Sequence, residues 1–137
     1  MKRKIIIASH NHLASGMKST LEFITGPQAN VECLDAYVDD KPIDQTVEKL
    51  IKQEDPDTEI VIFTDLMAGS VNQKFYPYRL RPHTHLITGM NLPLVLALAI
   101  ENTDTYLTSE RINHLINAGK EGMVYVNEFS TDDEEDE

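Results

Sequence analysis

Short apolar runs alternate with stretches of helical apolar spacing along most of the chain. The segments 4–8 and 59–65 are largely apolar and rich in β-branched residues, which is typical of strands buried on both faces of a parallel sheet. Less continuous runs predict two further strands and a short last strand, over 31–36, 83–88 and 122–126. Apolar residues at helical spacing predict helices over 13–24, 43–51, 94–100 and 109–119.

Turn-forming residues divide these predicted elements. Asn91 suits the N-cap of the helix that carries Leu94 to Ile100, and Pro93 lies in the first turn of that helix, where a missing N–H costs least. A small-residue turn at 67–70 leads into another helix of about ten residues, which ends near Arg81. The alternation of strands and helices predicts an α/β fold, with a doubly wound, mostly parallel sheet, helices on both faces and a short C-terminal edge strand.

A single domain accounts for nearly the whole chain. With 137 residues, the chain has the size of one ordinary domain. We expect this domain to span residues 1–128. It is followed at 129–137 by a tail that holds six carboxylates and that we expect to be disordered.

The charge balance and the apolar runs limit the partners and the compartment. The formal net charge is −11, but without the six tail carboxylates 17 acidic residues face 12 basic ones. Such a mildly acidic body argues against nucleic-acid binding and fits a basic protein partner. The single cysteine, Cys33, excludes an intramolecular disulfide and a cysteine-based zinc site. The apolar runs are too short for a signal peptide or a membrane span, so we expect a cytoplasmic protein.

Chemistry-bearing residues follow several of the predicted strands, and in doubly wound sheets ligands bind beyond the carboxyl ends of the strands. His10 follows the first strand, Asp65 follows the third, and Gly69 and Ser70 begin the next helix. If the first and third strands are neighbours, Asp65 accepts the proton of one imidazole nitrogen and leaves the other nitrogen free as a nucleophile. An anion at His10 would then meet backbone N–H groups at a helix start and the Ser70 hydroxyl.

Each of these residues also has an ordinary structural interpretation. His10 suits a loop histidine that hydrogen-bonds a helix start, and Asp65 suits an N-cap or turn residue. His83 and His85 share one face of a strand and could bind a metal, but a polar strand entry is the commoner explanation and no third ligand is evident. His12 fits a surface position. We therefore expect no metal and no cofactor, and the chain also has no Gly-rich ATP-binding motif.

Three segments carry a resemblance to a known family: 8–16 (ASHNHLASG), 63–70 (FTDLMAGS) and 88–94 (TGMNLPL). Together they resemble the IIA component of the mannose family of the bacterial phosphoenolpyruvate-dependent sugar phosphotransferase system. The resemblance extends in order and spacing from about residue 3 to about residue 126. Two positions depart from the family's usual residues, because Asn11 stands in place of Gly and 68–71 reads Ala-Gly-Ser-Val in place of Gly-Gly-Ser-Pro. Asn tolerates a left-handed backbone better than most residues, and Gly69 still permits a close backbone approach.

The resemblance implies a fold and a function. Members of the family have a mostly parallel α/β sheet whose last strand is exchanged or packed across a homodimer. His10 matches the histidine that accepts a phosphoryl group from the carrier protein HPr and passes it to a histidine of the IIB component. The IIB component in turn phosphorylates sugar that enters through membrane IIC and IID components. Asp65 matches the carboxylate that orients the histidine, and Gly69 and Ser70 match positions at the phosphoryl group.

Other functions are compatible with the same residues. The phosphotransferase subunit of dihydroxyacetone kinase has a similar motif after its first strand, and residues 65–66 and 71–72 resemble its second motif. Residues 89–93 favour the sugar system instead. A regulatory module that signals its phosphorylation state is a further alternative. A nucleotide- or flavin-binding protein is disfavoured because no Gly-rich phosphate loop follows the first strand. Because a IIA component does not contact the sugar, the sequence identifies neither the sugar nor the IIB partner.

Overall fold

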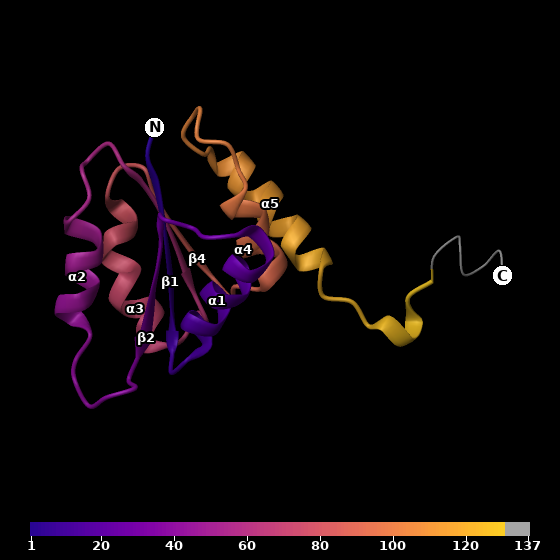
Figure 1. The fold of residues 1–137 in the computed structure, drawn as a ribbon, viewed down its shortest axis with the longest axis horizontal. Helices are drawn as coiled ribbons and strands as arrows, with labels where there is room; N and C mark the ends of the chain where they lie inside the picture. The colour runs from indigo at the N-terminus through magenta and orange to yellow at the C-terminus, as the bar shows by residue number, and fades with distance from the viewer. Residues whose placement is uncertain (131–137) are drawn as a thin grey trace.

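Four parallel strands form the centre of the structure, a computed structural model that describes residues 1–130 (Figure 1). The strands are β1 (Arg3–His10), β2 (Val31–Ala36), β3 (Glu59–Thr64) and β4 (Thr84–Thr88). The α/β fold and its four parallel strands are therefore confirmed. The acidic tail expected at 129–137 lies, from residue 131 on, outside the described residues.

The strand order places the ends of β1 and β3 side by side. The order is β2-β1-β3-β4, and each neighbouring pair is parallel. Ala8 of β1 is in register with Thr64 of β3, so His10 and Asp65 leave the sheet at the same edge. Because β2 lies on one side of β1 and β3 on the other, the strand order reverses here, which is where open α/β sheets bind ligands.

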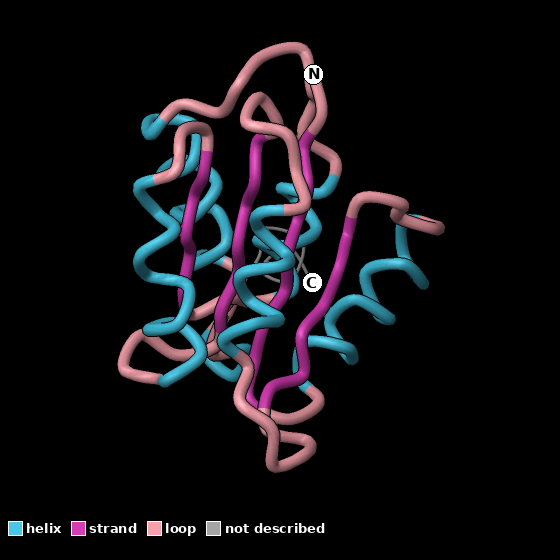
Figure 2. Tube along the Cα trace, turned by 90° about the vertical axis from the view of Figure 1, so that its left-hand side faces the viewer, coloured by secondary structure: helices cyan, strands magenta, loops and turns pink. Residues whose placement is uncertain are grey.

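Helices cover both faces of the sheet, as Figures 1 and 2 show. The helices are α1 (Leu13–Thr25), α2 (Asp44–Lys52), α3 (Ser70–Phe75), α4 (Leu92–Ala99) and α5 (Ser109–Glu121). One hydrophobic core joins the sheet to α1, α4 and α5, and a second core joins it to α2 and α3. Within residues 1–130, no helix has the length and apolar character that crossing a membrane requires.

The two cores explain why β1 is apolar at successive positions. Ile5 and Ile7 belong to the core on the α1 side, and Ile6 and Ala8 belong to the core on the α2 side. Successive side chains of a strand point to opposite faces, and here both faces are covered. All four side chains are buried.

The helix expected to run to Arg81 is shorter than predicted. The α-helical part, α3, ends at Phe75, and a 3₁₀ helix, η1 (Tyr76–Leu80), completes the segment. Pro77 accounts for the change, because proline has no N–H to donate and its ring clashes with the carbonyl four residues earlier in an α-helix. The tighter 3₁₀ turn accommodates the proline at its start.

The predicted C-terminal edge strand at 122–126 is wrong. Residues 122–125 have no strand structure, and a 3₁₀ turn, η2 (Val126–Glu128), follows them. After α5 the chain leads away from the sheet (Figure 1), so this segment does not lie along either edge strand, β2 or β4. Its apolar side chains are exposed, with Met123 at 83% and Val126 at 73% of their full accessible surface.

A buried ion pair closes the opposite, amino-terminal end of the sheet. Arg3 Nε donates to Glu59 Oε1 at 2.6 Å, and both side chains are almost fully buried. The other Glu59 oxygen accepts from the Leu107 backbone N–H at 2.7 Å and lies 3.1 Å from His85 Nε2. His85 is thus engaged with a structural carboxylate at the end of the sheet remote from His10.

His83, the other histidine of this segment, lies just before β4 and its ring stacks on Tyr106 with the centroids 3.6 Å apart. The described residues contain no group of three His, Cys, Asp or Glu side chains that could hold a metal ion. The contacts of His83 and His85 support the interpretation as a polar strand entry.

Candidate functional site

His10 and Asp65 meet at the carboxyl edge of the sheet. Nδ1 of His10 lies 2.8 Å from Asp65 Oδ2, and the same oxygen accepts a hydrogen bond from the His10 backbone N–H at 2.8 Å. The other carboxylate oxygen accepts from the Leu66 N–H at 2.9 Å. These contacts fix both the carboxylate and the histidine ring, which is the arrangement expected if the first and third strands are neighbours.

The environment keeps Asp65 ionised. Burial by itself would raise the pKa of this carboxyl group, but hydrogen bonds from the His10 backbone and ring and from the Leu66 N–H outweigh it, so the pKa lies below the usual value. An ionised carboxylate at Nδ1 accepts a proton from that nitrogen, so the neutral ring carries its hydrogen on Nδ1 and its lone pair on Nε2. The His10 side chain is 40% exposed, so it is accessible to a partner.

The turn after β3 brings Gly69 and Ser70 against the same ring. Ser70 Oγ lies 3.4 Å from His10 Nε2, a long contact on the side opposite Asp65. A Cβ atom at Gly69 would lie 2.9 Å from His10 Cε1 and 3.3 Å from the Leu66 carbonyl oxygen. Glycine at this position therefore permits a close backbone approach that any other residue would obstruct.

Two threonines and an asparagine hold the base of this turn. Thr64 Oγ1 lies 2.8 Å from Asn72 Oδ1 and 2.8 Å from Thr88 Oγ1. Asn72 is buried and also donates through Nδ2 to the Met67 carbonyl at 3.3 Å. The contacts tie the first turn of α3 to the ends of β3 and β4, so they determine where Ser70 stands relative to His10.

The loop after β2 adds Tyr37, a residue that the sequence reasoning missed. The Tyr37 hydroxyl lies 2.8 Å from Ser70 Oγ, and its ring centroid lies 5.6 Å from that of His10. The available signal was its position as the first residue after a strand adjacent to β1. The sequence prediction rests only on the ends of the first, third and fourth strands.

His12 forms a second histidine–carboxylate pair, but in a different setting. Its Nδ1 lies 3.2 Å from Asp35 Oδ2, and its side chain is 72% exposed. Asp35 Oδ1 also accepts from the Ser15 N–H at 2.9 Å, in the first turn of α1. Burial would raise the pKa of Asp35, but hydrogen bonds from Ser15 and His12 lower it below the usual value. These contacts give Asp35 a role in capping α1.

The structure explains Asn11, which stands where the family usually has Gly, and the segment 89–93. Asn11 has a φ of 55°, in the left-handed region that Asn tolerates and Gly adopts freely. Asn91 caps α4 as predicted, accepting from the Leu94 N–H at 3.0 Å and donating to the Gly119 carbonyl at 2.7 Å. The segment 89–93 therefore acts as a turn and a helix cap.

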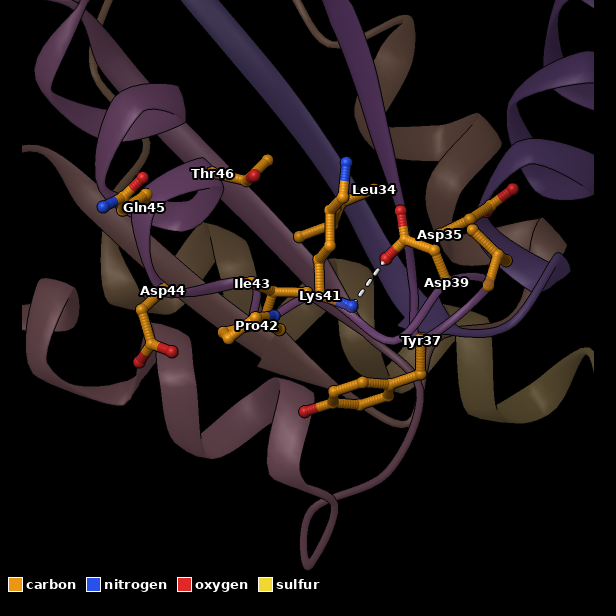
Figure 3. A pocket seen from close by; sticks show the side chains of 11 residues that line it. Leu34, Asp35, Tyr37, Asp39, Lys41, Pro42, Ile43, Asp44, Gln45 and Thr46 are labelled. Carbon is orange, nitrogen blue, oxygen red and sulfur yellow. Dashed lines mark hydrogen bonds between the residues drawn. The ribbon is translucent and has the colours of Figure 1, made fainter.

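A pocket of about 550 Å³ lies next to the site, between the end of β2 and the start of α2 (Figure 3). Tyr37 belongs to both, since it lines the pocket and bonds Ser70. Three carboxylates and one lysine give the pocket a negative balance of charge. They are Asp35, Asp39, Asp44 and Lys41. Because Asp44 is paired with Lys74 at 2.7 Å, the pocket keeps a small negative balance from Asp35 and Asp39 against Lys41, which favours a positively charged partner.

Comparisons with known proteins find a family model and solved structures that match most of this chain. Residues 4–116 match the model of the EIIA-man family, described as the fructose IIA component of the phosphotransferase system. A Klebsiella pneumoniae protein, described as a permease of the phosphoenolpyruvate-dependent sugar phosphotransferase system, is 36% identical; its structure matches with a TM-score of 0.81 over 93% of each chain.

Two further solved structures share the fold at lower identity. The IIA protein associated with the fucose utilization operon of Streptococcus pneumoniae is 22% identical, with a TM-score of 0.79 over 93% of this chain and 95% of that one. The mannose/sorbose-specific IIA subunit of Enterococcus faecalis is 17% identical, with a TM-score of 0.77 over 96% of this chain and 99% of that one. At these identities the likeness shows the fold.

Proposed function

The chain belongs to the EIIA-man family of phosphotransferase-system IIA components, and on this premise we propose that it carries a phosphoryl group on His10. It accepts the group from phosphorylated HPr and passes it to a histidine of a IIB component. The observation that carries this proposal is the orientation of His10: Asp65 engages Nδ1, and Nε2 faces the Ser70 hydroxyl.

The proposed transfer is an exchange between two histidines. The lone pair of His10 Nε2 attacks the phosphorus of the donor, so that a new N–P bond forms as the donor's N–P bond breaks. The donor imidazole leaves with the electron pair of that bond and becomes neutral, while His10 becomes a phosphorylated imidazolium. Asp65 stabilises this positive charge through Nδ1–H, and Ser70 donates to a phosphoryl oxygen. Catalysis is then mostly positioning and charge stabilisation.

We propose that the chain serves sugar uptake and acts in the cytoplasm. The description of the 36% identical Klebsiella protein and the resemblance at 89–93 both support the sugar system over a dihydroxyacetone kinase. The IIB component would pass the group on to sugar that enters through IIC and IID components. The negative pocket beside His10 supports docking of partners with positive surfaces. We also propose that the chain acts as a homodimer.

The proposal is tested by incubating the protein with phosphoenolpyruvate, enzyme I and HPr and measuring its intact mass. We expect the wild type to gain one phosphoryl group that is lost in acid, as expected of a phosphohistidine. His10→Ala should gain none. His12→Ala is the matched control, because it removes the neighbouring histidine and should still gain one group.

Two results would overturn the proposal. The first is a wild-type chain that stays unmodified while HPr in the same mixture is phosphorylated. The second is a phosphoryl group on His10→Ala. The first result would favour a regulatory module or a different donor, and the second would place the phosphoryl group on a residue other than His10.

A further inference from the structure

We propose that Tyr37 is a positioning residue for phosphoryl transfer, whose hydroxyl donates to Ser70 and holds the Ser70 hydroxyl beside Nε2 of His10, where the phosphoryl group arrives. The inference rests on the proposed function and adds a residue from a third strand end. Tyr37 Oη lies 2.8 Å from Ser70 Oγ, which lies 3.4 Å from Nε2. The three side chains thus form one chain of polar contacts that ends at the nucleophile.

The direction of this chain follows from the protons available. Asp65 accepts the hydrogen on Nδ1, so Nε2 carries a lone pair and, before the phosphoryl donor arrives, accepts from the Ser70 hydroxyl. Ser70 has a single hydroxyl hydrogen, and using it toward Nε2 leaves Ser70 Oγ to accept. Tyr37 then supplies its own hydroxyl hydrogen to Ser70. Linked hydrogen bonds polarise one another, so donation by Tyr37 strengthens donation by Ser70.

The backbone of Tyr37 supports a functional reason for this residue. Its φ is 67°, in the left-handed region that is unfavourable for a bulky side chain. Burial of the side chain does not offset this backbone cost, because the residue is 45% exposed. Unfavourable backbone conformations of this kind cluster at functional sites, where the surroundings maintain them. This conformation accompanies a side chain whose hydroxyl reaches Ser70 and whose ring lies 5.6 Å from that of His10.

Tyr37 acts on both sides of the transfer step. Before transfer it holds the Ser70 hydroxyl toward the attacking nitrogen. After the N–P bond to Nε2 forms, Ser70 turns its hydrogen to a phosphoryl oxygen and continues to accept from Tyr37. The Ser70 hydroxyl must release the Nε2 lone pair before the attack, but Tyr37 holds the Ser70 oxygen in place, so that only the hydroxyl hydrogen has to rotate.

The test is single-turnover transfer from phosphorylated HPr to the wild type, Tyr37→Phe, Ser70→Ala and the double variant, across a range of HPr concentrations. Tyr37→Phe keeps the ring and removes the hydroxyl. We expect its maximal rate to fall about 3- to 10-fold, the effect of losing one hydrogen bond. The HPr concentration at half-maximal rate should be unchanged. In the Ser70→Ala background, Tyr37→Phe should lower the maximal rate by less than about 2-fold, because Tyr37 acts through Ser70.

Tyr76→Phe is the matched control, since it removes a tyrosine hydroxyl from η1 and should leave the rate unchanged. Tyr37→Asn supplies a second test that does not depend on the ring. Asn tolerates the positive φ, so the thermal midpoint should hold or rise while the transfer rate falls at least as far as in Tyr37→Phe.

Two outcomes would overturn the role of Tyr37 while leaving the proposed function intact. One is a Tyr37→Phe rate equal to that of the wild type. The other is a full, additive loss in the Ser70→Ala background. Failure of the wild type itself to accept phosphate would instead overturn the proposed function, so the two failures are distinguishable.

Discussion

At the residue scale, the site depends on how closely the backbone approaches the His10 ring. Gly69→Ala should slow phosphoryl acceptance about 10-fold or more, because the new Cβ would lie 2.9 Å from His10 Cε1 and displace the ring. Gly16→Ala is the control, since a Cβ there meets no atom within 4 Å and should stabilise α1 by about 0.5–1 kcal/mol. Single-turnover kinetics with phosphorylated HPr measure both variants. Equal rates for the two would contradict this role of Gly69.

Asp65 links the site to the pH dependence of stability. Hydrogen bonds from the His10 backbone and ring overcome the effect of burial and lower the pKa of Asp65 in the folded protein. The resulting contribution to the free energy of unfolding is complete above about pH 4, the ordinary pKa of an aspartate in the unfolded chain. It is lost as the pH falls through the lower pKa of the folded state.

We therefore expect the free energy of unfolding of the wild type to exceed that of Asp65→Asn at neutral pH, and this difference to shrink below about pH 4. Urea titrations of both proteins across this range measure the difference. A difference that stays constant, or that grows as the pH falls, would contradict the hydrogen-bonding account of the Asp65 carboxylate.

At the element scale, the helix cap at Asn91 should contribute to stability and leave the chemistry unaffected. Its side chain bonds the Leu94 N–H and the Gly119 carbonyl, so it joins α4 to α5. Asn91→Ala should lower the free energy of unfolding by about 1–2 kcal/mol. Asn117→Ala, on the exposed surface of α5, should cost nothing. A large loss of phosphoryl acceptance in folded Asn91→Ala would show that this segment belongs to the site.

The elements that could be predicted from the sequence are those with a repeating pattern. β1 and β3 are predictable because both of their faces are buried, which requires apolar residues at successive positions. The predicted strand at 122–126 is wrong, although Val124 and Val126 favour strands locally. A strand must also pair with a sheet edge, and after α5 the chain leads away from the sheet. Likewise, a lone tyrosine in a loop has no periodicity, so the contact of Tyr37 with Ser70 appears only when the strand order is known.

At the scale of the whole molecule, the C-terminal segment bears on assembly. Residues 123–129 expose several apolar side chains beyond α5, which is the usual signature of an interaction surface. We expect a second copy of the chain to cover them, so the wild type should sediment as a dimer and a variant that ends at residue 122 as a monomer. A wild type that remains a monomer at high concentration would contradict this prediction.

The most direct test is to identify which ring nitrogen of His10 carries the phosphoryl group. Nuclear magnetic resonance of the ¹⁵N-histidine-labelled, phosphorylated protein distinguishes the two ring nitrogens. Because Asp65 engages Nδ1, the account predicts phosphorus on Nε2 of His10, with hydrogen retained on Nδ1. A phosphoryl group on Nδ1 of His10, or on a different residue, would contradict the account.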